Sequence, residues 1–206
     1  MSHRLAAITI GIVTLGATRV AFAQVLPTDA PVLRVFMMNE APVPPETLSS
    51  IEEEVGSVYA AAGVQVVWLH PVPDAPTDWQ MIDVAVKIAR GLGGPIMAAL
   101  DDDVLGFAAV NLEHPEHRGR IVWVFYDQIE KYTEWYHTQV DRLSAKVVAH
   151  EIGHLFLPAG HSESGLMRAR WDLHLDLLDY FTPEQAKMIR ARIRSEGPKI
   201  MVIKPR

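Results

Sequence analysis

The sequence predicts a single α+β domain in which helices pack against one mixed, mostly parallel, twisted sheet. Three observations support this prediction. The chain has 206 residues, which is about the length of one domain. Its composition, 49% apolar and 21% charged, is typical of a globular chain that buries a core. The predicted order of elements is strand, helix, several strands, helix, irregular segment and helix, without an internal repeat or a long linker.

Five apolar or alternating runs predict the strands. The run at 82–88 alternates, which indicates a half-buried strand, whereas the run at 121–126 is apolar throughout, which indicates a central one. Gly106 indicates a bulge or a close backbone approach in a short edge strand. The predicted strands are 32–38, 64–69, 82–88, 105–110 and 121–126.

Three helices are predicted from periodic apolar residues and from signals at their ends. The first opens at the Pro44-Pro45 pair and stops at Gly63. The second begins with the capping-box pattern at 138–141 and ends at Leu157, because a residue that precedes proline disfavours helical geometry. The third begins with the cap at 182–185.

Residues 1–23 predict a secretory signal peptide that is not part of the fold. A positively charged start is followed by an apolar stretch from Leu5 to Ala17 and by the small-x-small cleavage signal Ala21-Phe22-Ala23. The stretch is shorter than the roughly 20 residues that span a bilayer. We therefore expect an exported protein, periplasmic or secreted. Its domain comprises residues 24–206, with no membrane span after cleavage.

The charge and the cysteine content exclude several functions. The net charge is −6 and Lys and Arg are not clustered, so nucleic acid is not an expected partner. The chain contains no cysteine, which excludes disulfides, a thiolate nucleophile and thiolate metal ligands.

The segment His150-Glu151-Ile152-Gly153-His154 indicates a metal site. On a helix, His150 and His154 lie one turn apart on the same face, so both imidazoles can bind one ion. Glu151 is rotated by about 100° from His150, close enough to act on a metal-bound water without displacing a ligand. Gly153 weakens the helix, which indicates either that another group packs closely against its backbone or that the helix tolerates a glycine there.

A third imidazole follows the turn after this helix. Gly160 can adopt a turn that returns His161 toward the ion. Three neutral imidazoles with one open position are typical of a catalytic zinc. In an alternative arrangement the third ligand is a glutamate from a later helix, and Glu184 is the best-placed candidate.

This pattern resembles the metzincin clan of zinc endopeptidases. The resemblance rests on HExxH, on a third His after a turn, and on the segment Ser162-Glu163-Ser164-Gly165-Leu166-Met167. Within the clan, Ser162 directly after the third His is most similar to the matrixins.

The resemblance implies a function and a set of site residues. It implies one catalytic Zn²⁺, Glu151 as general base, and Met167 as the Met-turn residue beneath the ion. The edge strand that pairs with an extended peptide or protein substrate in this clan is similar to Leu105-Gly106-Phe107-Ala108. The implied zinc ligands are His150, His154 and His161.

Two departures from the clan pattern bear on this function. The third His comes one residue later than in HExxHxxGxxH, with Leu157 where the clan has Gly, so the turn before His161 must be wider. Ala169 stands where some branches of the clan carry a Tyr ligand. Without a latency cysteine, an exported protease must be kept harmless by narrow specificity, by a protein inhibitor or by inactivity. The alternative function is therefore a catalytically inactive, zinc-holding module that binds a protein or peptide.

Two further features carry weaker signals. Asp101-Asp102-Asp103 could bind calcium through carboxylate oxygens, but no complete ligand loop follows, and a solvated acidic turn is expected. Trp171, four residues after Met167, is a candidate either to line a specificity pocket or to pack behind the Met-turn.

Overall fold

The computed structural model describes residues 26–71, 83–91, 104–110, 120–172 and 179–196. The predicted signal peptide and Asp101–Asp103 lie outside these residues. The described residues form one five-stranded sheet in the order β2-β1-β3-β5-β4, in which all neighbours are parallel except β4 and β5. The mixed, mostly parallel sheet predicted from the sequence is therefore confirmed. Its strands are β1 (Val32–Asn39), β2 (Gln65–Leu69), β3 (Val84–Ala89), β4 (Gly106–Val110) and β5 (Arg120–Phe125).

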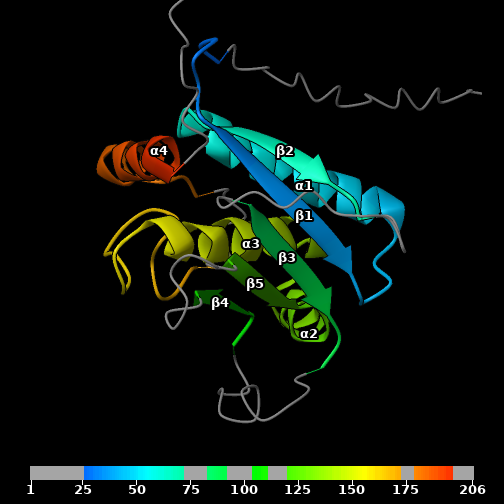
Figure 1. Cartoon of the computed structure of the whole chain (residues 1–206). Coiled ribbons are helices and arrows are strands. Elements are labelled where there is room, and N and C mark those ends of the chain that lie inside the picture. The colour runs from blue at the N-terminus through cyan, green and yellow to red at the C-terminus, as the bar shows by residue number, and fades with distance from the viewer. Residues whose placement is uncertain (1–25, 72–82, 92–103, 111–119, 173–178, 197–206) are drawn as a thin grey trace, which may run out of the picture.

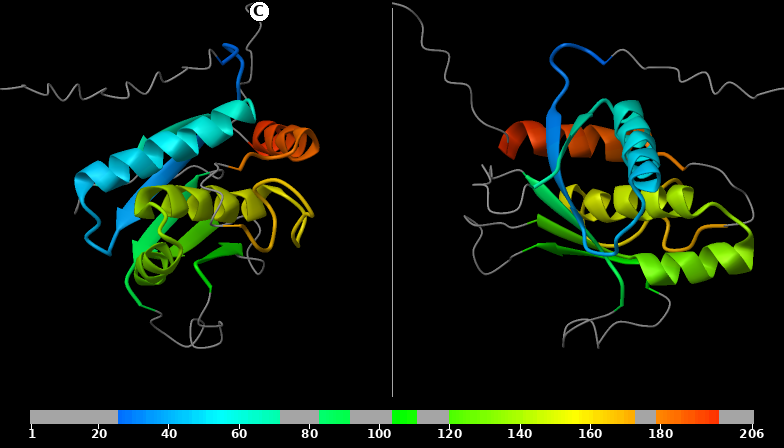
Figure 2. Two further views of the ribbon diagram at one scale, coloured as in Figure 1. Left: turned by 180° about the vertical axis from the view of Figure 1, so that it is seen from behind. Right: turned by 90° about the vertical axis from the view of Figure 1, so that its right-hand side faces the viewer.

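The helices are α1 (Pro45–Ala61), α2 (Tyr126–Tyr136), α3 (Val140–Phe156) and α4 (Pro183–Glu196). Helices α1 and α3 contact each other and lie on one face of the sheet, with α4 next to them (Figures 1 and 2). The main hydrophobic core fills the layer between this face and these helices. Within the described part of the chain, no helix combines the length and the apolar character needed to cross a membrane.

The ends of two helices form as their sequences predict. Helix α1 has a proline at its first position, where no backbone N–H is needed, and Gly63 follows its end with a φ of +74°. At the start of α4, the side chain of Thr182 accepts a bond from the Gln185 N–H and the Gln185 side chain accepts one from the Thr182 N–H. This reciprocal pair is a capping box.

The capping box predicted at 138–141 is wrong. Gln139 is the N-cap of α3, and its side chain makes no capping bond. Asp141 instead accepts a 2.6 Å hydrogen bond from Ser50 of α1, so its carboxylate ties two helices together. The competing partner lies 91 residues away in the chain and leaves no local signal.

Strand β3 is more buried than its alternating sequence predicts. It is the middle strand of the sheet, and all of its residues except the partly exposed Lys87 are buried. On the face away from the helices, Lys87 lies 4.4 Å from the ring centroid of Trp123 and forms an ion pair with Glu40. Long side chains therefore cover this face, which corrects the expectation of a half-buried strand. Strand β5, expected to be central, is an interior strand of the sheet, between β3 and β4.

Helix α2 was not predicted from the sequence. It follows β5 directly, and Tyr126, assigned to the strand by its aromatic character, is its first residue. Phe125 at the N-cap makes no side-chain capping bond, so the usual start signal is absent. Its C-cap, His137, has a φ of +53°, the left-handed geometry that commonly ends a helix.

Candidate metal centre

Helix α3 brings two histidines to one place near its C-terminal end. His150 and His154 are separated by one helical turn, and their Nε2 atoms lie 2.9 Å apart. The Nδ1 atom of His150 lies 2.9 Å from the carbonyl oxygen of Leu166. Because a carbonyl oxygen only accepts hydrogen bonds, this Nδ1 carries the proton and the Nε2 atom of His150 presents a lone pair toward His154.

The turn after α3 returns the chain toward these histidines. Leu157 is extended, with φ −103° and ψ 162°, so the helix ends where the following proline predicts. Gly160 has a φ of +105°, a conformation that other residues rarely adopt. Beyond His161, the backbone N–H of Ser162 donates a 2.8 Å hydrogen bond to the carbonyl of Met167. This bond closes the segment from Ser162 to Met167, and the turn before it places His161 beside the two histidines of α3.

The three histidines form a potential metal site. Their nearest ring nitrogens lie within 4.8 Å of one another, and among the described residues this is the group whose geometry could hold an ion. The ring centroid of His161 is 5.3 Å from that of His150 and 5.0 Å from that of His154. Glu184, the alternative third ligand, is in the first turn of α4 and is not part of this group.

The surroundings keep the inner histidines uncharged. His150 is buried, His154 is half-buried and His161 is exposed. Burial, reinforced by the two neighbouring histidines, lowers the pKa of His150 to about 4. Burial and the charge of His161 also lower the pKa of His154. Neutral imidazoles are the form that binds metals, so both groups are ready to act as ligands near neutral pH.

Glu151 is a buried carboxyl group beside the histidines. It is 9% exposed, and burial raises the pKa of its carboxyl to about 8. Its side chain packs against the first residue of β4, because a Cβ placed on Gly106 would lie 2.8 Å from Cγ of Glu151. Gly106 therefore marks a close backbone approach, as expected, and the residue approached is Glu151.

Met167 lies against the backbone of α3. It is 2% exposed, and a Cβ built on Gly153 would lie 2.7 Å from Sδ of Met167 and 3.0 Å from Cε1 of Phe181. The expectation that another group packs closely against Gly153 is therefore confirmed. The absence of a side chain at Gly153 lets Met167 pack directly beneath the helix that carries the histidines.

The predicted substrate strand is an edge of the sheet beside α3. Strand β4 pairs antiparallel with β5, and within the described ranges no other strand pairs with its outer edge. A Cβ on Gly106 would also meet Cγ1 of Val147 at 2.7 Å, so the strand begins directly against α3. Among the described residues, the outer edge of β4 is therefore unpaired and lies close to Glu151.

The similarity of this chain to known proteins was found in its structure and not in its sequence. No protein-family model and no curated protein matches the sequence. Among solved structures, archaemetzincin from Methanopyrus kandleri matches with a TM-score of 0.52 and 14% sequence identity. The match covers 82% of this chain and 98% of that chain. The chain has a metzincin-like fold. The likeness is one of fold, and this metzincin-like fold agrees with the α+β class and the clan resemblance inferred from the sequence.

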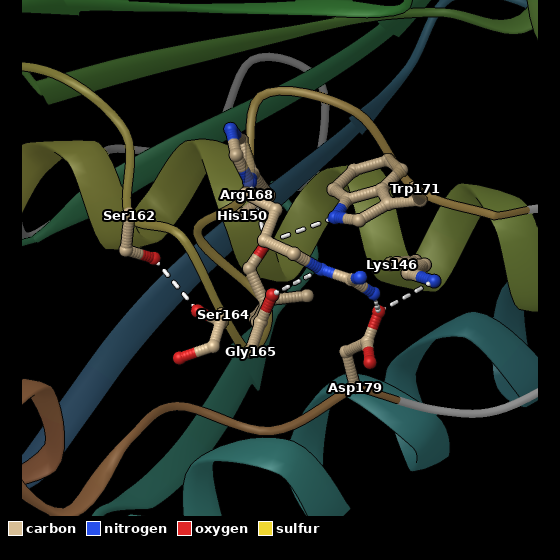
Figure 3. A network of polar contacts seen from close by, with 9 residues as sticks. Lys146, His150, Ser162, Ser164, Gly165, Arg168, Trp171 and Asp179 are labelled. Carbon is tan, nitrogen blue, oxygen red and sulfur yellow. Dashed lines mark hydrogen bonds and ion pairs between the residues drawn. The ribbon is translucent and has the colours of Figure 1, made fainter.

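A polar network that the sequence did not predict lies behind the metal centre of this metzincin-like fold (Figure 3). Lys146, one turn before His150, forms a 2.9 Å ion pair with Asp179, which also pairs with Arg168 at 3.1 Å. The signal that could have revealed it is Lys146 itself, a charged residue inside an otherwise apolar run of the helix that carries the histidines.

Proposed function

We propose that this protein is an exported, zinc-dependent endopeptidase of matrixin-like type, with residues 1–23 as its signal peptide. One observation carries the proposal. Three histidine side chains, two of them held neutral by their surroundings, converge around one point beside a buried glutamate. The metzincin-like fold supports the same function at a coarser level.

The donor set fits zinc. Imidazole nitrogens suit zinc and related transition metals, whereas calcium takes oxygen ligands. Two nitrogen ligands of a tetrahedral zinc lie about 3.3 Å apart, since each Zn–N bond is about 2.0–2.1 Å. The 2.9 Å separation of the His150 and His154 Nε2 atoms approaches this value. When bound, zinc would act as a Lewis acid that polarises a carbonyl oxygen and lowers the pKa of a coordinated water to about 7.

Glu151 is the proposed general base. It lies one residue from His150 and is held between α3 and the start of β4, so its carboxylate has few alternative positions. Burial favours its protonated form, and the positive charge of an ion held by the histidines would favour the carboxylate. Its carboxylate oxygen takes a proton from the attacking water and passes it to the leaving amine.

Strand β4 is the proposed platform for the substrate. An extended peptide can add to a free strand edge through main-chain hydrogen bonds, which hold the peptide without regard to its side chains. The edge of β4 begins at Gly106, next to Glu151, so a peptide bound there would pass the base. The expected substrate is therefore an extended segment of a peptide or protein.

The proposal is tested with zinc-loaded protein and a diverse peptide mixture. New peptide termini are identified by mass spectrometry for the wild type, Glu151→Gln and Glu184→Gln. Loss of a general base lowers turnover by about 10²- to 10⁴-fold. Glu151→Gln should show this loss while retaining one zinc per chain. Glu184→Gln should retain both zinc and turnover, because Glu184 is not among the clustered ligands.

Other results would lead to different conclusions. Undiminished cleavage by Glu151→Gln would contradict the assigned base. Loss of zinc in Glu184→Gln would favour the alternative ligand set. A wild type that holds one zinc per chain but cleaves nothing would favour the inactive module that binds a protein or peptide.

A further inference from the structure

The carbonyl of Leu166 accepts two hydrogen bonds at the metal centre. One comes from Nδ1 of His150 at 2.9 Å and the other from the indole Nε1 of Trp171 at 3.0 Å. The Trp171 ring also stands at 88° to the His150 ring, with centroids 5.1 Å apart (Figure 3). Trp171 therefore contacts both His150 and the Leu166 carbonyl, which determines which ring nitrogen of His150 is unprotonated.

A charged side chain of α3 also contacts the Trp171 ring. The ammonium of Lys146 lies 5.0 Å from the centroid of the Trp171 ring, a distance typical of cation–π contacts. Lys146 is buried and pairs with Asp179, which also binds Arg168. Arg168 in turn donates to the carbonyl of Gly165 at 3.3 Å. The network thus connects α3 to Gly165 and Arg168, the residues on either side of Leu166 and Met167.

We propose that Trp171 is a positioning residue for the metal-binding imidazole of His150. The proposal rests on the zinc site proposed above. With its N–H on the Leu166 carbonyl, Trp171 holds this acceptor in place, and the acceptor directs the Nε2 lone pair of His150 toward the other two histidines. Groups that orient a ligand imidazole typically change metal affinity by 10- to 100-fold when they are removed. Between the two roles considered for Trp171, the contacts favour packing behind the Met-turn.

The chain offers a matched control for this inference. Trp68 in β2 is also half-buried, and its indole N–H donates to a backbone carbonyl, that of Glu52, at 3.2 Å. Strand β2 is at the opposite edge of the sheet from β4. Trp68→Phe and Trp171→Phe each remove one indole-to-carbonyl hydrogen bond, so a general loss of stability affects both in a similar way.

The experiment measures zinc affinity by competition with a chelator, together with the visible spectrum of the Co²⁺-substituted protein. Trp171→Phe should bind zinc 10- to 100-fold more weakly than the wild type and change the Co²⁺ bands. Trp68→Phe should stay within about twofold of wild-type affinity with an unchanged spectrum. Unfolding of the metal-free proteins is compared to verify that the two substitutions cost similar stability.

Wild-type zinc affinity and spectrum in Trp171→Phe would overturn the positioning role. If Trp171→Phe does not fold, replacement of Trp171 by 3-benzothienylalanine removes only the N–H, since sulfur takes its place in a ring of similar shape. The same loss of affinity is then expected. A wild type that binds no zinc would instead overturn the proposed function.

Discussion

Substitution of Gly153 by alanine tests the packing beneath the metal-binding helix. Gly153 is inside α3, where alanine usually stabilises a helix by about 1 kcal/mol relative to glycine. At this position the new Cβ would lie 2.7 Å from Sδ of Met167 and 3.0 Å from Cε1 of Phe181. Both neighbours are buried, so neither can move into solvent.

Two opposing contributions determine how Gly153→Ala changes the free energy of unfolding. Overpacking a dense core costs about 1–3 kcal/mol, and the middle of this range exceeds the gain of about 1 kcal/mol in helix propensity. Gly153→Ala should therefore lower the free energy of unfolding by about 1 kcal/mol. Gly56, inside α1, is the matched control, because nothing lies within 4 Å of the Cβ it would receive. Gly56→Ala should raise the free energy of unfolding by about 0.5–1 kcal/mol.

Urea unfolding of the two variants and the wild type, at one pH and without metal, measures these changes. The midpoints should move in opposite directions with unchanged slopes. An increase in stability for Gly153→Ala equal to that for Gly56→Ala would refute the argument that Met167 and the helix backbone are in close contact. A changed slope in one variant alone would point to an altered denatured state.

Two further predictions concern Asp179 in the polar network and Glu151, the proposed general base. Burial tends to raise the pKa of Asp179, but the hydrogen bonds and charges of Lys146 and a neighbouring arginine hold it below its usual value. Asp179→Asn should therefore lower the free energy of unfolding by about 1 kcal/mol at pH 7. Urea titrations should show that this difference from the wild type is lost as the pH falls below about 4. A difference that does not depend on pH would contradict the assigned ion pairs. Gly106→Ala would place a Cβ 2.8 Å from Cγ of Glu151 and displace its carboxylate. The kcat for peptide cleavage should therefore fall by at least about tenfold, while the zinc content stays at one per chain. An unchanged kcat would show that β4 does not hold the carboxylate in place.

Much of the fold was predictable because its signals are local. Prolines, glycines and side-chain caps at the ends of α1 and α4 act on neighbouring backbone groups, so their effect can be inferred from adjacent residues. Helix α2 lacked such signals. Its aromatic and charged residues follow a strand without a turn, and the packing of Ile129 and Thr133 against the domain decides its conformation.

The candidate metal centre was also predictable only where its signals are local. The sequence by itself determined that His150 and His154 share one face of a helix, because four residues make about one helical turn. It also determined the end of that helix, through the proline after Leu157. These features depend on backbone geometry over a few residues.

Only the tertiary structure decided how the rest of the centre is built. The approach of Gly106 to Glu151 joins segments 45 residues apart in the numbering, and the carbonyl shared by His150 and Trp171 belongs to Leu166, in the loop beyond the helix. Such contacts depend on how helices, sheet and loops pack together. No local propensity encodes them, because each contact becomes favourable only after both of its partners have been brought into place.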